Sequence, residues 1–321
     1  MAMSVQPLLV GVDVSKAELV LCQDPERSVV VLENTTEAIG RWLDSLPGEP
    51  VCLAVEATNT YHLELVEQAH QRGHTIYIVD GLRLNRYRQS IGGRAKTDAS
   101  DARLLRRYLE REREDLRPWQ PPSKGYRAVQ QLLHRRAVLV RVKVALEQSL
   151  RELPELRQQA KALSDQFAKL DAALQQRLRE LVRACGWQED VARCQAVEGV
   201  GPLTAIAMTM AFQRGQFRSS DAFVAFLGLD VRVRDSGISR GRRKLTKQGD
   251  PELRRLLHLA AMQASRSPSW SAFYQRYLER GLAKTQALVI LARKLARVVF
   301  ALLKNQSTYQ PKVAGGACHE T

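Results

Sequence analysis

The segment from Lys124 to Arg183 contains almost no turn-forming residues, and this constrains the fold more than any other feature of the sequence. Leucine and valine recur through it at spacings of three to four residues and multiples of these, with charged residues and glutamine between them. This period is that of amphipathic helices, so we expect long helices or an antiparallel coiled coil, broken or kinked at Pro154. Such a segment is typical of a scaffold or an oligomerisation arm, and it divides the chain into three zones.

The first zone alternates strand and helix patterns and ends at the sequence Trp119-Gln120-Pro121-Pro122. Apolar, β-branched segments predict strands, and amphipathic segments predict helices. The expected strands are 8–21, 29–32, 51–55 and 75–79, and the expected helices are 37–46, 61–72 and one that runs to Glu112. This alternation predicts an α/β layer fold.

The third zone, from Cys194 to about Tyr309, is mainly helical with a basic loop inserted. Near its start, Gly199 and Gly201 resemble the turn of a helix-hairpin-helix, where glycines let the backbone approach a phosphate at a helix N-terminus. The alternative is an ordinary turn between two helices. We expect four regions: an α/β domain at 1–122, a helical linker and oligomerisation region at 123–189, a mainly helical domain at 190–309, and a disordered tail at 310–321.

The chain is strongly basic, with 49 Lys and Arg against 34 Asp and Glu and a net charge of +15. This balance favours a polyanionic partner, foremost nucleic acid. Residues 81–113 and residues 231–255 each carry a net charge of +6, so the charge is clustered. Clusters of this kind favour phosphate contacts, although a solvated basic loop is the alternative for some members. The candidate nucleic-acid-binding side chains are Arg94, Lys96, Arg234, Arg240, Arg242, Arg243, Lys244 and Lys247.

Several classes of protein do not fit the composition. No uninterrupted apolar run approaches the roughly 20 residues of a membrane span, and the N-terminus does not resemble a signal peptide. The five cysteines are odd in number and form no CxxC pair, so neither a disulfide framework nor a zinc site is expected. We therefore expect a cytoplasmic protein, without a membrane partner.

Two carboxylates occupy the ends of apolar strand segments. Asp13 lies in Leu8-Leu9-Val10-Gly11-Val12-Asp13-Val14, and Glu56 follows Val51-Cys52-Leu53-Ala54-Val55. An ionised carboxylate in apolar surroundings is costly unless a cation or hydrogen-bond donors compensate it. For Asp13 alone, capping of the turn before Ser15 is an equal alternative.

Two further carboxylates, Asp98 and Asp101, are spaced i and i+3 and would share one face of a helix. The alternative is that Thr97 or Asp98 caps this helix and that acids in its first turn complement the helix dipole. Four carboxylates are hard oxygen ligands that suit Mg²⁺ or Mn²⁺, and such sites serve phosphoryl transfer. A strand Asp, a strand Glu and helix Asp residues in this order form the ribonuclease-H-like arrangement of nucleases and integrases.

These segments together resemble a known family. Three segments resemble the N-terminal RuvC-like domain of insertion sequence 110 family transposases, which are also called DEDD transposases. These segments are GVDVSKAELVL, VEATNTYHLELVEQAHQRGHTIYIVD and GGRAKTDASDARLL. This family includes Piv-type DNA invertases. Its C-terminal transposase domain is similar to VEGVGPLTAIAMTMAF and FVAFLGLDVRVRDSGISRGRRKLTKQGDPELRRLLHLAA. The resemblance spans about residues 8–305, and SGISRGRRKLTKQG is closer to the subgroup typified by insertion sequence 1111.

The resemblance implies that Asp13, Glu56, Asp98 and Asp101 are the catalytic metal-binding tetrad and that Ser236 is the catalytic nucleophile. It implies a recombinase guided by a bridge-type non-coding RNA of the same element, which pairs with donor and target DNA. The serine would form a phosphoserine link, and strands would exchange through a Holliday-junction-like intermediate. Composite active sites in the family imply a homo-oligomer, either a dimer or a tetramer.

A serine hydroxyl is a poor nucleophile until a base or a metal activates it, and no histidine lies near Ser236 in the sequence. Mg²⁺ on the carboxylates would meet this need, and the basic residues around the serine would stabilise phosphate charge. Ser239 lies three residues later and is an alternative nucleophile.

Three other functions fit parts of the pattern. A RuvC-like junction endonuclease would cut with metal-activated water and would not need Ser236. A non-catalytic nucleic-acid-binding protein would use only the basic segments. A sugar-kinase-like or actin-like ATPase also opens with strand-Gly-x-Asp, but the chain has no later glycine-rich phosphate loop and its charge does not suit a metabolite.

Overall fold

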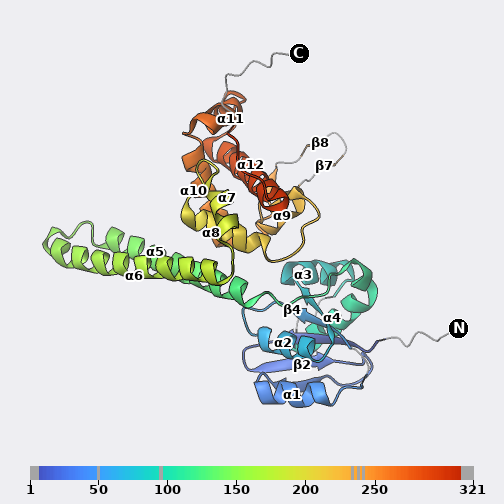
Figure 1. Cartoon of the computed structure of the whole chain (residues 1–321). Coiled ribbons are helices and arrows are strands. Elements are labelled where there is room, and N and C mark those ends of the chain that lie inside the picture. The colour runs from blue at the N-terminus through green and yellow to red at the C-terminus, as the bar shows by residue number, and fades with distance from the viewer. Residues whose placement is uncertain are drawn as a thin grey trace. The chain divides into compact units, whose positions relative to one another are not determined.

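The computed structural model describes residues 7–48, 51–93, 97–232, 235–236, 239–240 and 243–311. The chain divides into two compact units, residues 1–121 and residues 122–321 (Figure 1). None of the helices in these ranges combines the length and the apolar character needed to cross a membrane.

The first unit is built on a five-stranded mixed sheet with the strand order β3-β2-β1-β4-β5. Strands β1, β2 and β3 are antiparallel neighbours, whereas β1, β4 and β5 run parallel. The strands are β1 (Leu9–Val14), β2 (Glu18–Cys22), β3 (Val30–Glu33), β4 (Cys52–Glu56) and β5 (Thr75–Val79). The predicted strands 29–32, 51–55 and 75–79 are thus confirmed to within a residue.

The prediction of a single strand over residues 8–21 is wrong, because this segment is a β-hairpin. Ser15 closes its turn: the hydroxyl accepts a hydrogen bond from the backbone N–H of Glu18 at 2.9 Å, and the Ser15 N–H donates to the Glu18 carbonyl at 2.9 Å. The turn contains neither glycine nor proline, so the apolar pattern passes through it without an obvious interruption.

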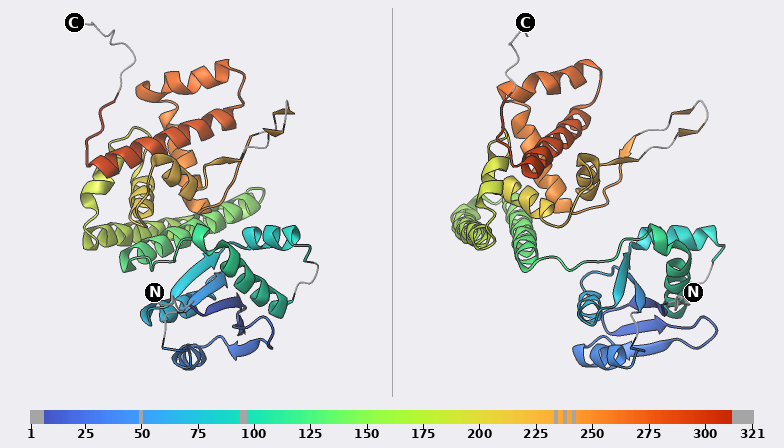
Figure 2. Two further views of the ribbon diagram at one scale, coloured as in Figure 1. Left: turned by 90° about the vertical axis from the view of Figure 1, so that its right-hand side faces the viewer. Right: turned by 45° about the vertical axis from the view of Figure 1, so that its right-hand side comes forward.

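Helices cover both faces of this sheet (Figure 2). Alternate residues of a strand point to opposite faces, and Val10, Val12 and Val14 pack in one core with α1 and α2. The other face carries α3 and α4, whose buried side chains pack with those of β4 and β5. The helices are α1 (Thr36–Asp44), α2 (Leu63–Gln71), α3 (Gly81–Ser90) and α4 (Asp98–Glu112), followed by a 3₁₀ turn (Arg113–Asp115).

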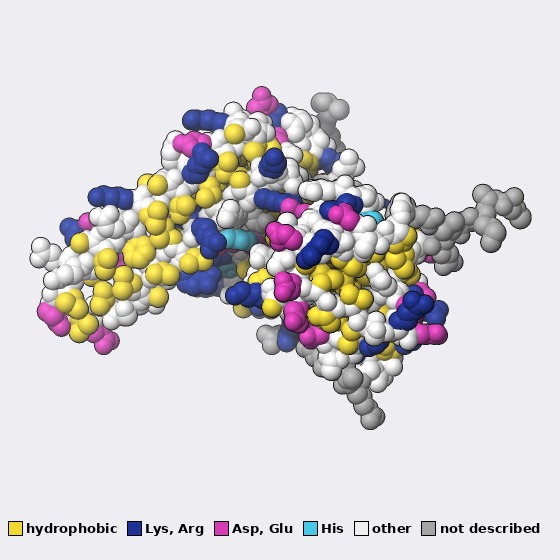
Figure 3. All heavy atoms as spheres, turned by 90° about the horizontal axis from the view of Figure 1, so that it is seen from below, with side chains coloured by type: hydrophobic (Ala, Val, Ile, Leu, Met, Phe, Trp, Pro, Cys, Tyr) yellow, Lys and Arg dark blue, Asp and Glu magenta, His cyan; other side chains and the backbone are white. Residues whose placement is uncertain are grey.

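In the second unit, α5 (Lys124–Ser149) and α6 (Arg157–Ala184) form a helical hairpin, joined by a 3₁₀ turn that begins at Pro154 (Pro154–Leu156). The predicted long helices and the break at Pro154 are confirmed. The base of the hairpin is buried in the core of the unit, through residues that include Val129, Leu133 and Leu178. Farther along, the apolar stripe is exposed, as Figure 3 shows along this arm. The side chains that are about half exposed are Val138, Val142, Leu163 and Leu170.

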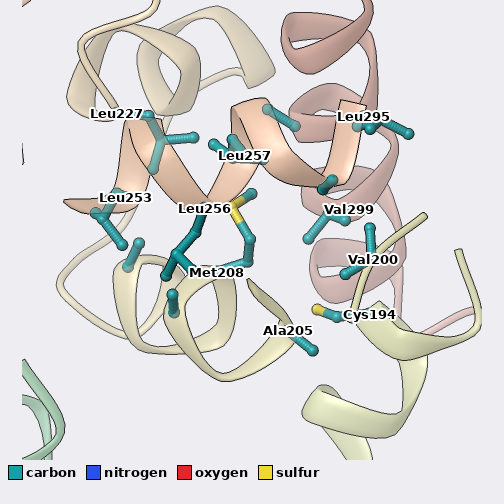
Figure 4. Close-up of a cluster of buried hydrophobic side chains, with 14 of the residues drawn as sticks. Cys194, Val200, Ala205, Met208, Leu227, Leu253, Leu256, Leu257, Leu295 and Val299 are labelled. Atoms are coloured by element: carbon teal, nitrogen blue, oxygen red, sulfur yellow. The ribbon is translucent and has the colours of Figure 1, made fainter. Parts of the chain in front are cut away.

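The remaining helices pack around α8, which is buried from Thr204 to Ala211. Figure 4 shows Met208 of α8 against Leu256 and Leu257 of α10, with Val299 of α12 in the same cluster. The helices are α7 (Gln188–Gln195), α8 (Pro202–Phe212), α9 (Ser220–Phe226), α10 (Pro251–Ala264), α11 (Pro268–Glu279) and α12 (Lys284–Asn305). A mixed α/β part followed by a helical part agrees with the predicted fold class.

The basic loop between α9 and α10 contains two short antiparallel strand pairs. They are β6 (Val231–Arg232) with β9 (Lys244–Leu245), and β7 (Asp235–Ser236) with β8 (Ser239–Arg240). Most of the predicted disordered tail, from residue 312 onward, lies outside the described residues.

Candidate active site

Asp13 and Glu56 lie side by side at the carboxyl ends of neighbouring parallel strands. The register of β1 and β4 pairs Val12 with Val55, so Asp13 and Glu56 occupy the next positions along the two strands. Both side chains lie on the face of the sheet opposite that of the valines, which is the face that α4 covers. Ser15 rather than Asp13 makes the hydrogen bonds of the following turn, so capping does not explain Asp13.

Helix α4 brings Asp98 and Asp101 to the same face. Its N-terminus is closed by a capping box in which Thr97 Oγ1 accepts from the Ser100 N–H at 3.2 Å and Ser100 Oγ accepts from the Thr97 N–H at 2.9 Å. The predicted cap at Thr97 is confirmed, and it uses neither aspartate. Asp98 is exposed and Asp101 is buried, one turn apart on the helix.

Gly11 allows α4 to lie directly on β1. A Cβ at this position would overlap the carbonyl oxygen of Ala102 and the backbone nitrogen of Arg106, both of which belong to α4. These are backbone atoms, so no change of rotamer would relieve the overlap. Glycine at position 11 therefore sets the distance between the helix that carries two of the acids and the strand that carries Asp13.

Three carboxylates lie close enough to Asp13 to affect its ionisation. The pKa of Asp13 is raised to about 6, first by burial and then by the charges of Asp98, Asp101 and Glu56, while a backbone hydrogen bond at Val14 lowers it only in part. The folded protein therefore disfavours the charged form of the Asp13 carboxyl group.

Arg88 of α3 is a part of this site that sequence reasoning missed. It donates a hydrogen bond from Nη2 to Asp101 Oδ1 at 2.5 Å, and both side chains are nearly buried. Ser100 Oγ donates to the same oxygen at 3.2 Å. Arg88 lies in the basic segment 81–113, but its spacing from Asp101 corresponds to no local motif, so only the packing of α3 on α4 identifies it.

The donor set of the site fits a hard divalent cation. The site offers four carboxylates as possible ligands, and burial together with the charges of Asp98, Asp101 and Glu56 raises the pKa of Asp13. Oxygen donors of this kind suit Mg²⁺ or Mn²⁺. Within the ranges that the structure describes, no three acidic, histidine or cysteine side chains are already gathered closely enough to hold a metal ion. A bound ion would therefore have to draw these carboxylates together.

Ser236 lies in the second unit, on β7, where it pairs with Ser239 of β8. The two candidate residues are therefore register partners at the end of a two-stranded hairpin. Arg240 follows Ser239 on β8 and pairs with Asp235. Arg94, Lys96, Arg234 and Arg242 lie outside the described residues.

Comparisons with known proteins match both units. A family model described as a transposase, of the IS110 DEDD type, matches residues 10–158, and a second, described as transposase IS116/IS110/IS902 family, matches residues 192–275. The first contains all four acids and the second contains Ser236. The chain belongs to the IS110 family of transposases. It is a DNA-recombining enzyme of this family.

Named relatives agree with this assignment. The pilin gene-inverting protein of Moraxella bovis is 28% identical over 281 residues, which cover 81% of this chain and 82% of the relative. The transposase for insertion sequence element IS1111A of Coxiella burnetii is 30% identical over 163 residues, covering 49% of this chain and 44% of the relative. A probable family 20 transposase of Pseudomonas aeruginosa is 33% identical over 165 residues, covering 50% and 46%.

Three of the candidate nucleic-acid-binding residues lie around β9, in the basic loop between α9 and α10. Arg243, Lys244 and Lys247 are exposed on β9 and its flanks. Arg243 and Lys244 line a cavity of about 700 Å³ together with Arg293 of α12. The Nε atom of Arg293 is buried without a hydrogen-bond partner among the described residues, and burial lowers the pKa of this guanidinium. This cluster of cations is suited to phosphate.

The two glycines of the expected helix-hairpin-helix turn have different surroundings. Gly199 has a φ of +88°, and a Cβ there would overlap Ala260 and Ala264 of α10, so helix packing accounts for this glycine. Gly201 is exposed at the N-cap of α8, with no heavy atom within 4 Å of a Cβ placed on it. Open access to the first turn of a helix is compatible with a phosphate contact, and the contact predicted for Gly201 stays a prediction.

Proposed function

We propose that this transposase cleaves and exchanges DNA strands at a divalent-metal site made by Asp13, Glu56, Asp98 and Asp101. The observation that carries the proposal is the pKa of Asp13, raised to about 6 by burial and by three neighbouring carboxylates. A group of acids held together against their mutual repulsion is typical of a functional site that binds a cation. Mixed-sheet topology, with acids at the carboxyl ends of β1 and β4, supports a RuvC-like, ribonuclease-H-like domain over residues 1–122.

Mg²⁺ or Mn²⁺ would supply Lewis-acid chemistry that stabilises negative charge at a phosphate. Asp13 and Glu56 hold their places through the register of two adjacent strands, and Asp98 and Asp101 through the capped first turn of α4. Arg88 orients the carboxylate of Asp101 by its hydrogen bond. These residues therefore preorganise the acids, which lowers the cost of drawing them around an ion.

Ser236 is the proposed nucleophile. Its Oγ attacks a backbone phosphorus, so that a serine–phosphate bond forms and the bond from phosphorus to a DNA oxygen breaks. The serine hydroxyl loses its proton, and the leaving DNA oxygen gains one. Reversal onto the end of another strand restores the serine and completes strand exchange. Arg243, Lys244 and Lys247, in the same basic loop, would stabilise phosphate charge. Ser239 is the alternative nucleophile.

Further partners follow from the family resemblance. We propose that a guide RNA from the same element selects donor and target DNA, and the two separate basic segments support contacts with more than one nucleic-acid strand. The exposed apolar stripe on α5 and α6 supports a homo-oligomerisation role for residues 123–189. Residues 190–309 would then form the transposase domain that carries the serine, and residues 310–321 would form a tail. The enzyme would act in the cytoplasm, on DNA of the nucleoid.

The test is a search for an SDS-resistant protein–DNA adduct in cells that carry the whole element, with Mg²⁺ present. Wild type is compared with Ser236→Ala, Ser239→Ala and Asp13→Asn. An adduct in wild type and in Ser239→Ala, but not in the other two, is the expected result. Cleavage without an adduct that survives Ser236→Ala would refute the serine step and favour a RuvC-like endonuclease that uses metal-activated water.

A further inference from the structure

A cavity of about 530 Å³ in the second unit lies between the α8–α9 loop and the last turns of α12. Its volume is within the range of ligand pockets, about 300–1,000 Å³. It is lined by Phe212, Gln213, Gly215, Gln216, Phe217, Phe300 and Lys304. Aromatic, amide and cationic side chains therefore meet at this one cavity.

The aromatic side of the cavity is rigid. Phe217 packs edge-on against Phe223 and Phe226, with ring centroids 5.1 and 5.3 Å apart, and Phe212 packs against Phe300 at 5.9 Å. Phe223 is completely buried, whereas Phe212 and Phe217 are partly exposed. The cluster therefore puts two partly exposed rings in the lining of the cavity, each packed against other aromatic rings.

An amide group is also held beside this surface. Gln213 Nε2 donates to the carboxylate of Asp190 at 3.2 Å, and Gln306 and Arg193 donate to the same carboxylate, each at 3.2 Å. Because its NH₂ group is directed to Asp190, the amide oxygen of Gln213 is the group left as an acceptor. Gln216 is exposed and lines the cavity with a second amide, so donors and acceptors are both available.

Cations flank the cavity. Lys304 is exposed, with its Nζ 5.7 Å from the centroid of the Phe300 ring, and Arg218 follows Phe217 on the exposed side of the loop. Gly215 is exposed and has no heavy atom within 4 Å of a Cβ placed on it, so the loop is open at this point. An anionic group of a ligand can therefore lie close to the aromatic surface.

We propose that this cavity binds one unpaired nucleotide of a single-stranded nucleic acid. Its base stacks on the Phe212–Phe217 surface, its Watson–Crick edge faces the amides of Gln213 and Gln216, and its phosphate lies near Lys304. Stacking on aromatic side chains with hydrogen bonds to a free base edge is how proteins recognise unpaired nucleotides. Single-stranded RNA and single-stranded DNA share this chemistry, whereas a closed duplex does not. The proposal rests on the proposed function, which requires the chain to bind nucleic acid.

The experiment measures the affinity of the full chain for three fluorescent probes: a short single-stranded RNA, single-stranded DNA of the same sequence, and the corresponding DNA duplex. Gly215→Leu adds a bulky side chain to the lining of the cavity, at a position where a Cβ has no other heavy atom within 4 Å. Gly48→Leu is the matched control, since Gly48 also has open space around its Cβ. Gln216→Ala removes an exposed amide without disturbing the core. Stacking of one base accounts for about a 5-fold to 150-fold difference in affinity, so Gly215→Leu should weaken single-strand binding at least fivefold.

The expected result is weaker binding of a single strand by Gly215→Leu and Gln216→Ala, with duplex binding and the Gly48→Leu protein unchanged. An effect on RNA alone identifies RNA as the source of the nucleotide, and an effect on DNA alone identifies a displaced DNA strand. Equal loss for duplex and single strands, or no loss in Gly215→Leu, would overturn this inference and leave the proposed function standing. A wild-type chain that binds none of the probes would overturn both.

Discussion

Replacing Asp13 by asparagine should make the first unit more stable at neutral pH while it abolishes strand cleavage. Asparagine keeps the size of the side chain and an oxygen that can accept the backbone hydrogen bond at Val14. It removes the charge that burial and the carboxylates of Glu56, Asp98 and Asp101 disfavour. The same substitution removes a proposed metal ligand, so stability and activity should move in opposite directions.

The magnitude follows from the shift of the pKa from 3.8 to about 6. The folded protein holds this proton more tightly than the unfolded chain, so stability falls as the pH rises through this interval. The penalty is absent below about pH 4 and complete above about pH 6. A shift of about two units at 1.36 kcal/mol per unit corresponds to about 3 kcal/mol, which is the upper limit of the gain expected for Asp13→Asn at pH 7.5.

The assay is hydrogen exchange of the amides of β1 and α4 in the full chain, measured by mass spectrometry without divalent ions and corrected for the intrinsic effect of pH. Wild type should lose protection between pH 4 and pH 6.5, and Asp13→Asn should not. Added Mg²⁺ should protect wild type and leave Asp13→Asn unchanged. Asp115→Asn, at an exposed acid of the same unit, serves as the control. Lower protection of β1 in Asp13→Asn at pH 7.5, or a pH dependence equal to that of wild type, would refute the reasoning.

Three further predictions concern the neighbours of this site and the basic hairpin. Gly11→Ala should displace α4 from β1, destabilise the first unit by about 1–3 kcal/mol and, for a shift of about 1 Å, reduce strand cleavage about 100-fold. The control Gly48→Ala should change neither stability nor cleavage, and normal cleavage in Gly11→Ala would contradict the close packing. Arg88→Gln should leave Asp101 buried without its cation, at a cost of about 3–5 kcal/mol that hydrogen exchange of α4 would detect, and unchanged exchange would exclude the ion pair. Lys244→Gln should reduce the slope of log affinity against log salt by about one in DNA titrations, and an unaltered slope would exclude a phosphate contact there.

The strands and helices of the first unit were largely predictable, because apolar periodicity reflects burial of one face within a short segment. The strands 51–55 and 75–79 and the helix that ends at Glu112 appear close to their expected bounds. The hairpin at Ser15 was not predictable from this signal. Its turn has no glycine or proline, and β1 and β2 are both apolar, so the pattern does not change where the chain reverses.

The carboxylates were also visible in the sequence, because acids are conspicuous at the ends of apolar strands. Gly11 carries a further signal in the sequence, because glycine inside a strand often marks close approach of another backbone, here that of α4. Gly199 shows the same close approach at α10, while its predicted phosphate contact stays a prediction. Local sequence cannot distinguish these two uses of a glycine, because both require only the absence of a Cβ.

By itself, the sequence determined the strands 51–55 and 75–79, the long helices on either side of Pro154, the clustering of charge and the positions of the four acids, since each depends on residues close together in the chain. Tertiary structure alone decided which acids meet and what surrounds them. The parallel pairing of β1 with β4 aligns Asp13 with Glu56, and the packing of α3 on α4 brings Arg88 to Asp101. Contacts of this kind arise from the burial of whole faces of sheets and helices, and no short spacing in the chain encodes them.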